Sequence, residues 1–376
     1  MLDSLNIANY RSLKNLRVNS LGRINLITGK NNTGKSTILE AIAIFATKGD
    51  FSNIYQLLTE RGEYYRQTEI SKNITDYNIK ALSSLFTNRY VGFENDKFIS
   101  IGSVENTLFG EDQSYENSVT LRFVKYFDEV QKDNQGLANR KRLIIDDASE
   151  KDHVNFKVGF ECKTNKTSNI ISLDEERPYR FGFRGFSFIE NFQFIRTGSI
   201  DREMNGKLWD SIALTDKEQY VIEALKIIEP ATERIAFIDE NSRERIAKIK
   251  LSSSQNVLPL KSMGDGINRV LTIILALVNS DNGYLLIDEF ENGLHFSVQE
   301  QLWKIIFDLS QKLNVQVFVT THSNDCIKGF ETILNESDNT NLGKLIRLDN
   351  IHGEIQQVSY DASELNIAID NNIETR

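Results

Sequence analysis

The segment with the clearest chemical pattern runs from Gly29 to Ser36. It reads G-K-N-N-T-G-K-S and fits the pattern G-x-x-x-x-G-K-S. The apolar run Ile24–Thr28 before it predicts a buried strand, and Lys35–Phe45 carries apolar residues at helical spacing. A loop of this composition between a strand and a helix is the setting in which the pattern binds phosphate groups.

The expected chemistry of this loop follows from its residue types. Gly29 and Gly34 let the backbone approach a ligand closely, so that its N–H groups point at phosphate oxygens. Lys35 is expected to reach the β and γ phosphates of a bound nucleotide, and the Ser36 hydroxyl to bind Mg²⁺. The other loop residues expected to contact the nucleotide are Asn31, Asn32, Thr33 and Thr37.

A pair of acids stands at the end of a later apolar run. Tyr284–Ile287 predicts a strand that is followed directly by Asp288 and Glu289. Alone, such a pair is common at a solvated turn. In a chain that also has a phosphate-binding loop, we expect Asp288 to hold Mg²⁺, and Glu289 to orient the attacking water and accept its proton.

Two further segments have residues suited to phosphate. Val315–Val319 predicts the next strand, and His322 beyond it can hydrogen-bond a γ-phosphate, although a histidine after a strand is more often an ordinary loop residue. Ser262 opens the segment Ser262–Gly266 before a helical pattern, and as an N-cap it would leave several N–H groups free for an anion. Taken alone, that segment is read as a helix cap without a ligand.

The elements that must position these residues differ along the chain. Residues 1–48 and 186–376 alternate strands with helices, which predicts a parallel α/β sheet that binds ligands at the carboxyl ends of its strands. Residues 49–185 predict an inserted lobe, with a helix near Thr75–Phe86 and an exposed polar loop at Lys132–Arg142. Further strands are expected at Val119–Phe127, Val154–Cys162, Ile170–Leu173 and Phe186–Ile189.

Composition narrows the class of protein. The 376 residues carry a net charge of −9 and only two cysteines, which argues against a disulfide framework and against a protein that is basic throughout. The longest apolar stretch, Val270–Val278, falls far short of the roughly 18–20 residues that cross a membrane. A cytoplasmic protein without a membrane partner is expected.

The order of the motifs resembles the ABC-type ATPase head. Residues 29–36 correspond to Walker A, Ser262–Gly266 to the signature, Tyr284–Glu289 to Walker B, Phe290–His295 to the D-loop and His322 to the switch histidine. The resemblance implies an α/β head with a mixed or parallel sheet core, an antiparallel β lobe and an inserted helical and β region. It also implies a homodimer or higher homo-oligomer in which Ser262 and Gly264 face the γ-phosphate bound to the opposite subunit.

The spacing of the motifs and two local segments indicate which ABC-type ATPases this chain resembles. The long separation between Walker A and signature, without heptad repeats, resembles RecF and OLD-like ATPases more than SMC proteins or transporters. The opening Asn9–Leu16, N-Y-R-S-L-K-N-L, and Asp288–His295, D-E-F-E-N-G-L-H, are similar to segments of those ATPases. This resemblance adds Arg11 to the nucleotide-binding residues and leaves Gln193 as the candidate Q-loop residue.

The resemblance extends to bacterial antiphage defence ATPases, including the PARIS ATPase. It implies a slow ATPase that switches a separately encoded effector, such as a Toprim-type nuclease, with DNA or a phage protein as trigger. Only residues 323–376 follow His322, too few for a Toprim domain, so this chain alone is not expected to cut DNA.

Three other functions remain as alternatives. A RecF-like repair ATPase would bind DNA, and a basic run could serve this purpose, although a solvated loop is the simpler reading. The inserted lobe disfavours a transporter ATPase, and ATP could also be bound only as structural glue between subunits. The residues of the basic run are Lys132, Arg140, Lys141 and Arg142.

Overall fold

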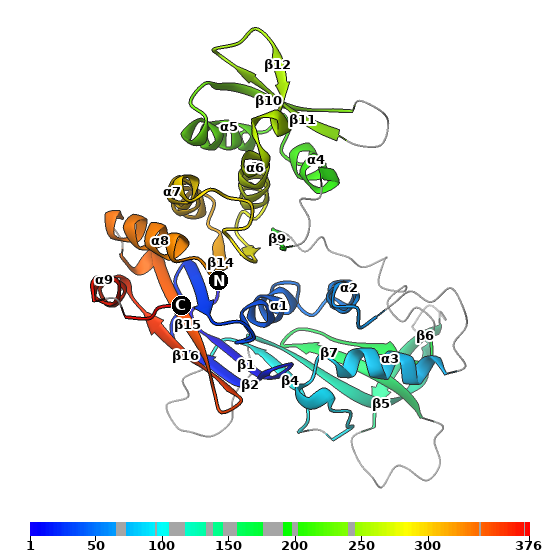
Figure 1. Cartoon of the computed structure of the whole chain (residues 1–376). Helices are drawn as coiled ribbons and strands as arrows, with labels where there is room; N and C mark the ends of the chain where they lie inside the picture. Colours follow the sequence, from blue (N-terminus) through cyan, green and yellow to red (C-terminus); the bar gives the residue numbers. More distant parts are fainter. Residues whose placement is uncertain are drawn as a thin grey trace.

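A computed structural model describes residues 1–64, 73–94, 96–104, 117–132, 138–145, 156–175, 191–197, 202–239, 245–337, 340–371 and 373–376. These residues form three sheets with helices between and around them (Figure 1). No helix among the described residues combines the length and apolarity needed to cross a membrane.

The central sheet carries the predicted phosphate-binding loop. Its strand order is β16-β15-β3-β14-β13-β9, and every neighbouring pair is parallel except β15 with β16. The middle strands are continuous apolar runs, as expected for strands covered on both faces. Their bounds are β3 Ile24–Gly29, β9 Phe192–Ile195, β13 Tyr284–Ile287, β14 Gln316–Thr320, β15 Gly343–Ile351 and β16 Glu354–Tyr360.

Successive side chains of these strands point into two different cores. Leu285 and Ile287 belong to the core that also contains apolar residues of α5–α8, whereas Leu286 lies in the core that contains α1. Figure 1 shows α1 between the central sheet and the second sheet. The helices mentioned here are α1 Lys35–Ala46, α5 Lys217–Ile228, α6 Asp265–Val278, α7 Phe296–Lys312 and α8 Asn324–Glu336, with α9 Ala362–Asp370 beyond them.

The second sheet is entirely antiparallel. Its order is β2-β1-β4-β5-β7-β8, and β6 pairs with residues 126–132 of β5, beyond the stretch that pairs with β4. The lobe expected from residue 49 onward therefore extends a sheet that begins in the first residues of the chain. The elements are β1 Leu5–Tyr10, β2 Leu13–Val18, α2 Phe51–Glu60, α3 Ile74–Ser83, η1 Thr87–Arg89, β4 Ile99–Gly102, β5 Ser118–Lys132, β6 Ala138–Ile144, β7 Lys157–Thr164 and β8 Ser168–Ser172.

A third, small sheet lies between β9 and α6 in the chain. Strands β10, β11 and β12 pair antiparallel, and Ile235, Phe237 and Ile249 turn one face of this sheet into the core shared with α5 and α6. The described elements of this part are α4 Arg202–Asp210, β10 Thr232–Asp239, β11 Arg245–Leu251, β12 Val257–Pro259 and η4 Leu260–Met263; η5 Thr340–Leu342 precedes β15.

The α/β class predicted from the sequence is confirmed: the described residues form a mixed central sheet with helices and a second, antiparallel sheet. The expected loop at Lys132–Arg142 is wrong for residues 138–142, which form β6 against β5. Opposite charges across this pair, such as Arg142 facing Asp128, stabilise a polar strand that has little apolar pattern. The strand expected at Phe186–Ile189 lies outside the described residues, and the division at residues 48 and 185 stays a prediction.

One buried side chain fastens the start of the chain to the central sheet. Gln316 is 2% exposed; its Nε2 donates to the carbonyl oxygens of Leu2 (2.7 Å) and Gly22 (2.9 Å). Its Oε1 accepts from the Leu2 N–H at 2.8 Å. A single amide therefore satisfies three main-chain groups that are shielded from water.

Replacing Gln316 by leucine keeps the volume and removes these partners. Because the N–H and carbonyl groups of Leu2 would lose this partner, while Gly22 keeps a bond from Asn25, we expect Gln316→Leu to lower the free energy of unfolding by about 3 kcal/mol. Urea denaturation measures the change. The exposed Gln301 of α7 gives the matched control, and Gln301→Leu should stay within about 0.5 kcal/mol of the parent. Equal midpoints for the two variants would contradict the assignment.

Candidate nucleotide-binding site

The loop between β3 and α1 has the backbone that the sequence predicts. Gly29 has φ +138° and Gly34 has φ +89°, conformations that L side chains rarely adopt. A Cβ at Gly29 would lie 2.5 Å from the carbonyl oxygen of Leu348, so the neighbouring strand also requires glycine there. Gly34 is the N-cap of α1 and supplies no side-chain cap, which leaves the first N–H groups of the helix available to an anion.

Lys35 lies inside this loop. It is 7% exposed, and its Nζ donates to the carbonyl oxygens of Gly29 (2.6 Å) and Lys30 (2.9 Å). Burial lowers the pKa of Lys35 to about 8, and the nearby carboxylates, Asp288 foremost, oppose that shift. A buried ammonium that bonds only to carbonyl groups is suited to a phosphate ligand.

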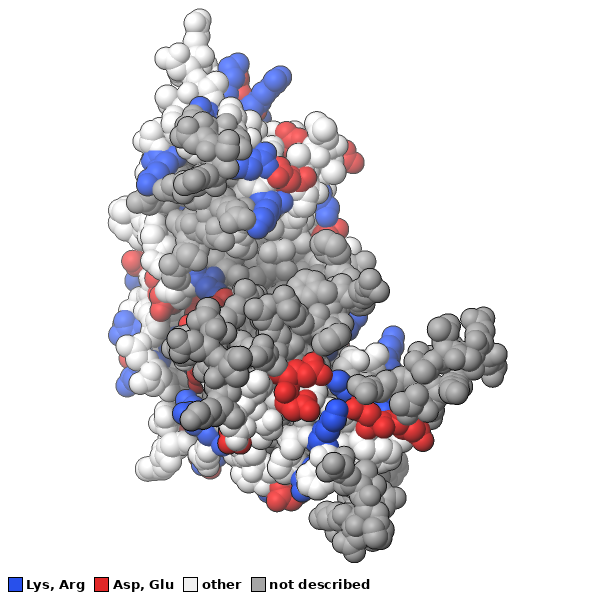
Figure 2. Space-filling model, turned by 90° about the vertical axis from the view of Figure 1, so that its right-hand side faces the viewer, with Lys and Arg blue, Asp and Glu red and all other residues white. Residues whose placement is uncertain are grey.

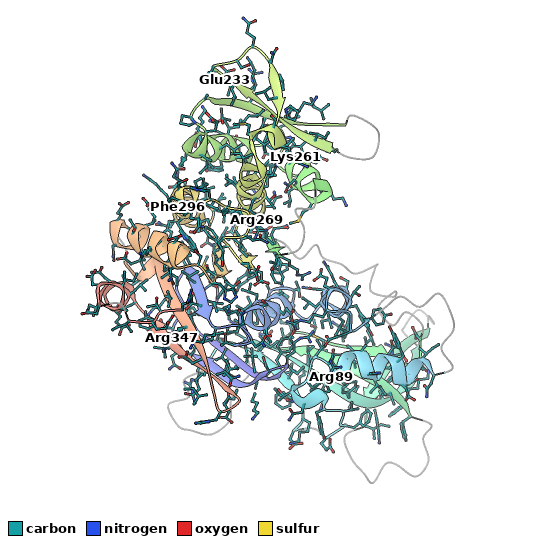
Figure 3. The ribbon with its side chains drawn as sticks, in the orientation of Figure 1. Arg89, Glu233, Lys261, Arg269, Phe296 and Arg347 are labelled. Carbon is teal, nitrogen blue, oxygen red and sulfur yellow. The ribbon has the colours of Figure 1, made fainter. Side chains whose placement is uncertain are left out.

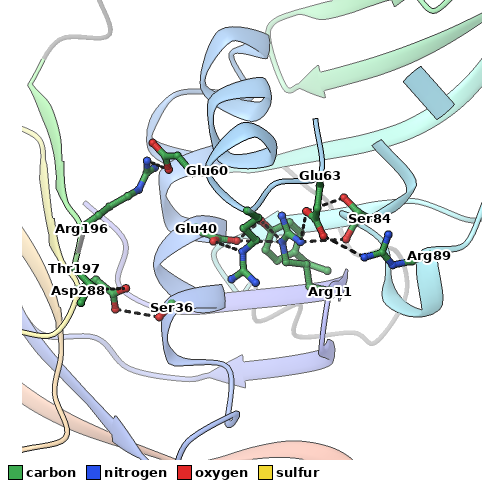
Figure 4. A network of polar contacts seen from close by, with 12 residues as sticks. Arg11, Ser36, Glu40, Glu60, Glu63, Ser84, Arg89, Arg196, Thr197 and Asp288 are labelled. Carbon is green, nitrogen blue, oxygen red and sulfur yellow. Dashed lines mark hydrogen bonds and ion pairs between the residues drawn. The ribbon is translucent and has the colours of Figure 1, made fainter. Parts of the chain in front are cut away.

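Asp288 is the point at which the separate elements meet (Figure 4). Its Oδ1 accepts from the hydroxyl groups of Ser36 (3.1 Å) and Thr320 (2.6 Å). Its Oδ2 accepts from the hydroxyl of Thr197 at 3.2 Å. The predicted juxtaposition of Ser36 and Asp288 is therefore present, although their role in binding metal stays a prediction.

The donor set suits Mg²⁺. One carboxylate and one hydroxyl beside a phosphate-binding loop match the way Mg²⁺ is held, with phosphate oxygens and waters completing the shell. Within the described part of the chain, no group of three or more His, Cys, Asp or Glu side chains could hold a metal by itself. Ser36 and Asp288 would thus hold the ion only together with the phosphates.

Glu289 follows in an unusual conformation. Its φ of +50° is left-handed, which is uncommon for a glutamate and turns the chain sharply after β13. Its N–H donates to the Thr320 hydroxyl at 2.9 Å, and no described residue donates a hydrogen bond to its carboxylate. The half-buried carboxylate is thereby available to a water molecule.

The segment containing His322 is tied to the D-loop. The N–H of His322 and the hydroxyl of Thr321 each donate to a carboxylate oxygen of Glu291 at 2.7 Å. The imidazole of His322 is half-buried and has no hydrogen-bond partner among the described residues. Its backbone is fixed, and its ring is left to contact a ligand.

The signature segment differs from the expectation. Ser262 is not the N-cap of α6: it lies in η4, is exposed, and donates to the carbonyl oxygen of Pro259 at 2.7 Å. The N-cap is Gly264, with φ +103° and open space where a Cβ would be. In the described structure no hydrogen bond joins Ser262 or Gly264 to the phosphate-binding loop of the same chain.

Arg11 occupies a buried ion-pair network rather than an open position beside the loop. Its guanidinium lies 3.1 Å from Glu40 of α1 and 2.9 Å from Glu63 (Figure 4). The turn that contains it nevertheless touches the loop, because a Cβ at Gly34 would lie 3.4 Å from the Ser12 hydroxyl. Direct nucleotide binding by Arg11 stays a prediction.

Sequence reasoning missed Thr197 and Thr320 as partners of Asp288. Gln193, the residue proposed for the Q-loop, lies within β9 opposite Leu285, whereas Thr197 lies beyond the end of that strand and reaches the carboxylate. Thr320 is the last residue of β14, and a polar residue at the carboxyl end of a parallel strand is the signal that could have indicated it. Thr197 lies two residues beyond β9 and carries no such signal.

Comparisons with known proteins agree with this geometry. The model of the family described as AAA ATPase domain matches residues 1–327. An ATP/GTP phosphatase of Helicobacter pylori is 25% identical over 374 residues, covering 93% of this chain and 92% of that protein. The DNA replication and repair protein RecF of Rickettsia typhi is 23% identical over 365 residues, covering 88% of this chain and 96% of RecF.

Solved structures are more distant. An SMC head bound to the C-terminal winged-helix domain of ScpA covers 98% of this chain and 99% of that chain, with 13% identity and a TM-score of 0.49. An SMC head from Thermotoga maritima covers 96% of this chain with a TM-score of 0.44.

The lowered pKa of Lys35 makes ligand binding depend on pH. A bound phosphate group favours the charged ammonium, so its pKa rises on binding and the protein takes up a proton wherever the free site is deprotonated. Titration calorimetry in buffers of different ionisation enthalpy should detect uptake of between about a half and one proton per Mg·ATP at pH 8.5. Near pH 6.5, where Lys35 is already charged, little uptake through Lys35 is expected.

The control for this measurement is Lys35→Arg, which remains charged at both values of pH. Its binding should show no additional uptake at pH 8.5. The assignment is contradicted if the arginine variant and the parent take up the same number of protons.

Proposed function

The chain belongs to the AAA ATPase domain family, and from that premise we propose that it binds and hydrolyses ATP with Mg²⁺ in a site that two copies complete. The observation that carries the proposal is the contact between the Ser36 hydroxyl and the Asp288 carboxylate, next to the buried Lys35. It brings a hydroxyl, a carboxylate and an ammonium to the end of a loop that leads into a helix N-terminus without a side-chain cap.

The side chains have separate tasks in this proposal. Lys35 and the loop N–H groups bind the phosphates, while Ser36 and Asp288 hold the metal ion. When bound, Mg²⁺ neutralises charge on the phosphate oxygens and orients them. Glu289 accepts a proton from the water whose oxygen bonds to the γ-phosphorus, as the bond to the oxygen bridging β and γ breaks. His322 is proposed to hydrogen-bond the γ-phosphate.

A second copy is proposed to close the site. Ser262 is exposed and Gly264 faces open space, so both are accessible to another molecule. The motif order supports a head-to-tail arrangement in which they cover the nucleotide of the opposite subunit. Each nucleotide would then be bound by the loop of one copy and by the signature of the other.

The biological role proposed is that of a cytoplasmic, slow ATP-driven switch in bacterial antiphage defence. The closed dimer would present a surface to a separately encoded effector, such as a Toprim-type nuclease, and DNA or a phage protein would be the trigger. The similarity of Asn9–Leu16 and Asp288–His295 to OLD-like ATPases supports this role. Copurification of a neighbouring-gene product, lost with Lys35→Ala, tests it.

The second candidate is a RecF-like ATPase that binds DNA. Similarity to RecF over 88% of the chain favours it. Two features weigh against a broad basic surface: Arg142 and Lys157 both pair with Asp128, and basic and acidic side chains intermix among the coloured residues of Figure 2. ATP-dependent binding of duplex DNA that weakens steeply with salt would favour the RecF-like function.

Changing Glu289 tests hydrolysis directly. Because glutamine cannot accept the proton from water, Glu289→Gln should lower turnover by about 10²–10⁴-fold while Mg·ATP still binds. Phosphate release and equilibrium binding of a fluorescent ATP analogue measure the two effects. Glu300→Gln, an exposed change on α7, should leave both values near those of the parent. Unchanged turnover in Glu289→Gln would refute the assignment.

Mixing two inactive variants tests the shared site. Lys35→Ala removes the phosphate ligand, and Ser262→Arg blocks the signature, so each variant alone should be inactive. In a mixed dimer the intact loop of one copy meets the intact signature of the other. An equal mixture should therefore recover up to about a quarter of parental turnover. If subunits exchange but turnover does not return, the shared site is wrong.

A further inference from the structure

A buried arginine stands behind the catalytic turn. Arg269 of α6 is 3% exposed, and Figure 3 labels it close to β9. Its Nη2 donates to the carbonyl oxygens of Asp288 (3.2 Å) and Glu289 (3.3 Å), and its Nη1 to that of Arg196 (3.4 Å). One guanidinium thus holds the turns that follow β13 and β9.

Burial of this charged side chain would be unfavourable for folding if its role were only structural. No carboxylate lies within ion-pair distance of it in the described structure, and its buried Nε has no hydrogen-bond partner. Burial lowers the pKa of Arg269 below its ordinary value, against the opposing charges of Asp288, Glu289 and Glu291. Burying a charge without a direct ion pair is destabilising, and an apolar residue at this position would avoid that cost.

The carbonyl groups that Arg269 binds belong to the residues whose placement matters most. Glu289 has φ +50°, a strained conformation for such a residue that must be held by its surroundings. Thr320 binds its N–H and Arg269 binds its carbonyl group. Together they fix the peptide groups on both sides of Glu289, and with them the direction of its carboxylate.

The same helix begins at the signature. Helix α6 starts at Asp265, directly after Gly264, and a Cβ on Gly266 would lie 3.3 Å from the carbonyl oxygen of Gly293 in the D-loop. A movement of α6 would therefore displace the D-loop through the close approach at Gly266, and the catalytic turn through the hydrogen bonds of Arg269.

We propose that Arg269 is a positioning residue that fixes the left-handed turn at Glu289 and makes the direction of the general base depend on the placement of α6. The inference rests on the proposed function, in which Glu289 is that base. The inference extends the proposed function, because the helix that follows the signature would then determine the rate of hydrolysis rather than the nucleotide affinity.

Kinetics of Arg269→Gln and Arg269→Lys test the positioning role. Since misplacement of a catalytic group by about 1 Å can cost about 10²-fold, Arg269→Gln should lower kcat by about that factor, with nucleotide Kd within about threefold of the parent. Arg269→Lys keeps the charge but not the fork, and should restore part of kcat. In the Glu289→Gln background, Arg269→Gln should add little further loss, because both changes act through one carboxylate.

Thr272→Val is the matched control. Thr272 is also buried on α6, and its hydroxyl bonds to the Asn268 carbonyl and to Asn205, away from the catalytic turn. This variant should lower the melting temperature without changing kcat. Losses of kcat and nucleotide affinity in equal measure, or a loss fully additive with Glu289→Gln, would overturn the proposal.

Amide hydrogen exchange gives a readout that does not need turnover. The N–H of Phe290 bonds to the carbonyl of Thr320 at 3.0 Å, so it reports the turn directly. In both Arg269 variants, amides of residues 289 and 290 should exchange at least about tenfold faster, and in Thr272→Val they should match the parent. Exchange within about twofold of the parent would refute the inference even if the protein hydrolyses ATP. If the Arg269 variants exchange faster but the parent protein shows no turnover, the proposed function alone would be refuted.

Discussion

The carboxylate of Asp288 sets the main constraint on this molecule. Hydroxyl groups from the start of α1, the end of β14 and the residues after β9 all reach it within hydrogen-bond distance. They can converge only if the carboxyl ends of β3, β14, β13 and β9 lie at one edge, which parallel pairing in that order provides. The hydrogen bonds to this one carboxylate therefore require the strand order and parallel pairing of the central sheet.

Charge at this edge is finely balanced. The buried cations Lys35 and Arg269 both lie in the field of Asp288, Glu289 and Glu291. The carboxylates supply negative charge that attracts a divalent cation, and the cations supply positive charge that attracts a polyphosphate. Lys35 bonds to carbonyl groups at the loop and Arg269 to carbonyl groups at the turn, so neither cation neutralises a carboxylate by direct contact.

Local pattern was sufficient to predict the loop, the strand that ends before Asp288, the strand that ends before His322, and the placement of Ser36 beside Asp288. It failed where the determinant is a partner distant in sequence. Thr197 and Arg269 have no local signature, since their value comes from the carboxylate and carbonyl groups that folding brings to them. Residues 138–142 form a strand because β5 pairs with them, with Asp128 and Glu129 opposite Arg142 and Lys141. Arg11 lies in a segment similar to one in RecF and OLD-like ATPases, but its guanidinium pairs with Glu40 and Glu63.

The register of β3 has a consequence for synthesis of the protein. This strand leaves the ribosome well before β14 and β15, with which it pairs and whose residues lie about three hundred positions later. At about 5–20 residues per second, both edges of β3 wait on the order of tens of seconds for their neighbours. During that interval the apolar strand is a template for wrong pairing. Early growth of the antiparallel β1–β2 hairpin and its sheet would shelter the nascent chain, and chaperone demand should be greatest before residue 316 is translated.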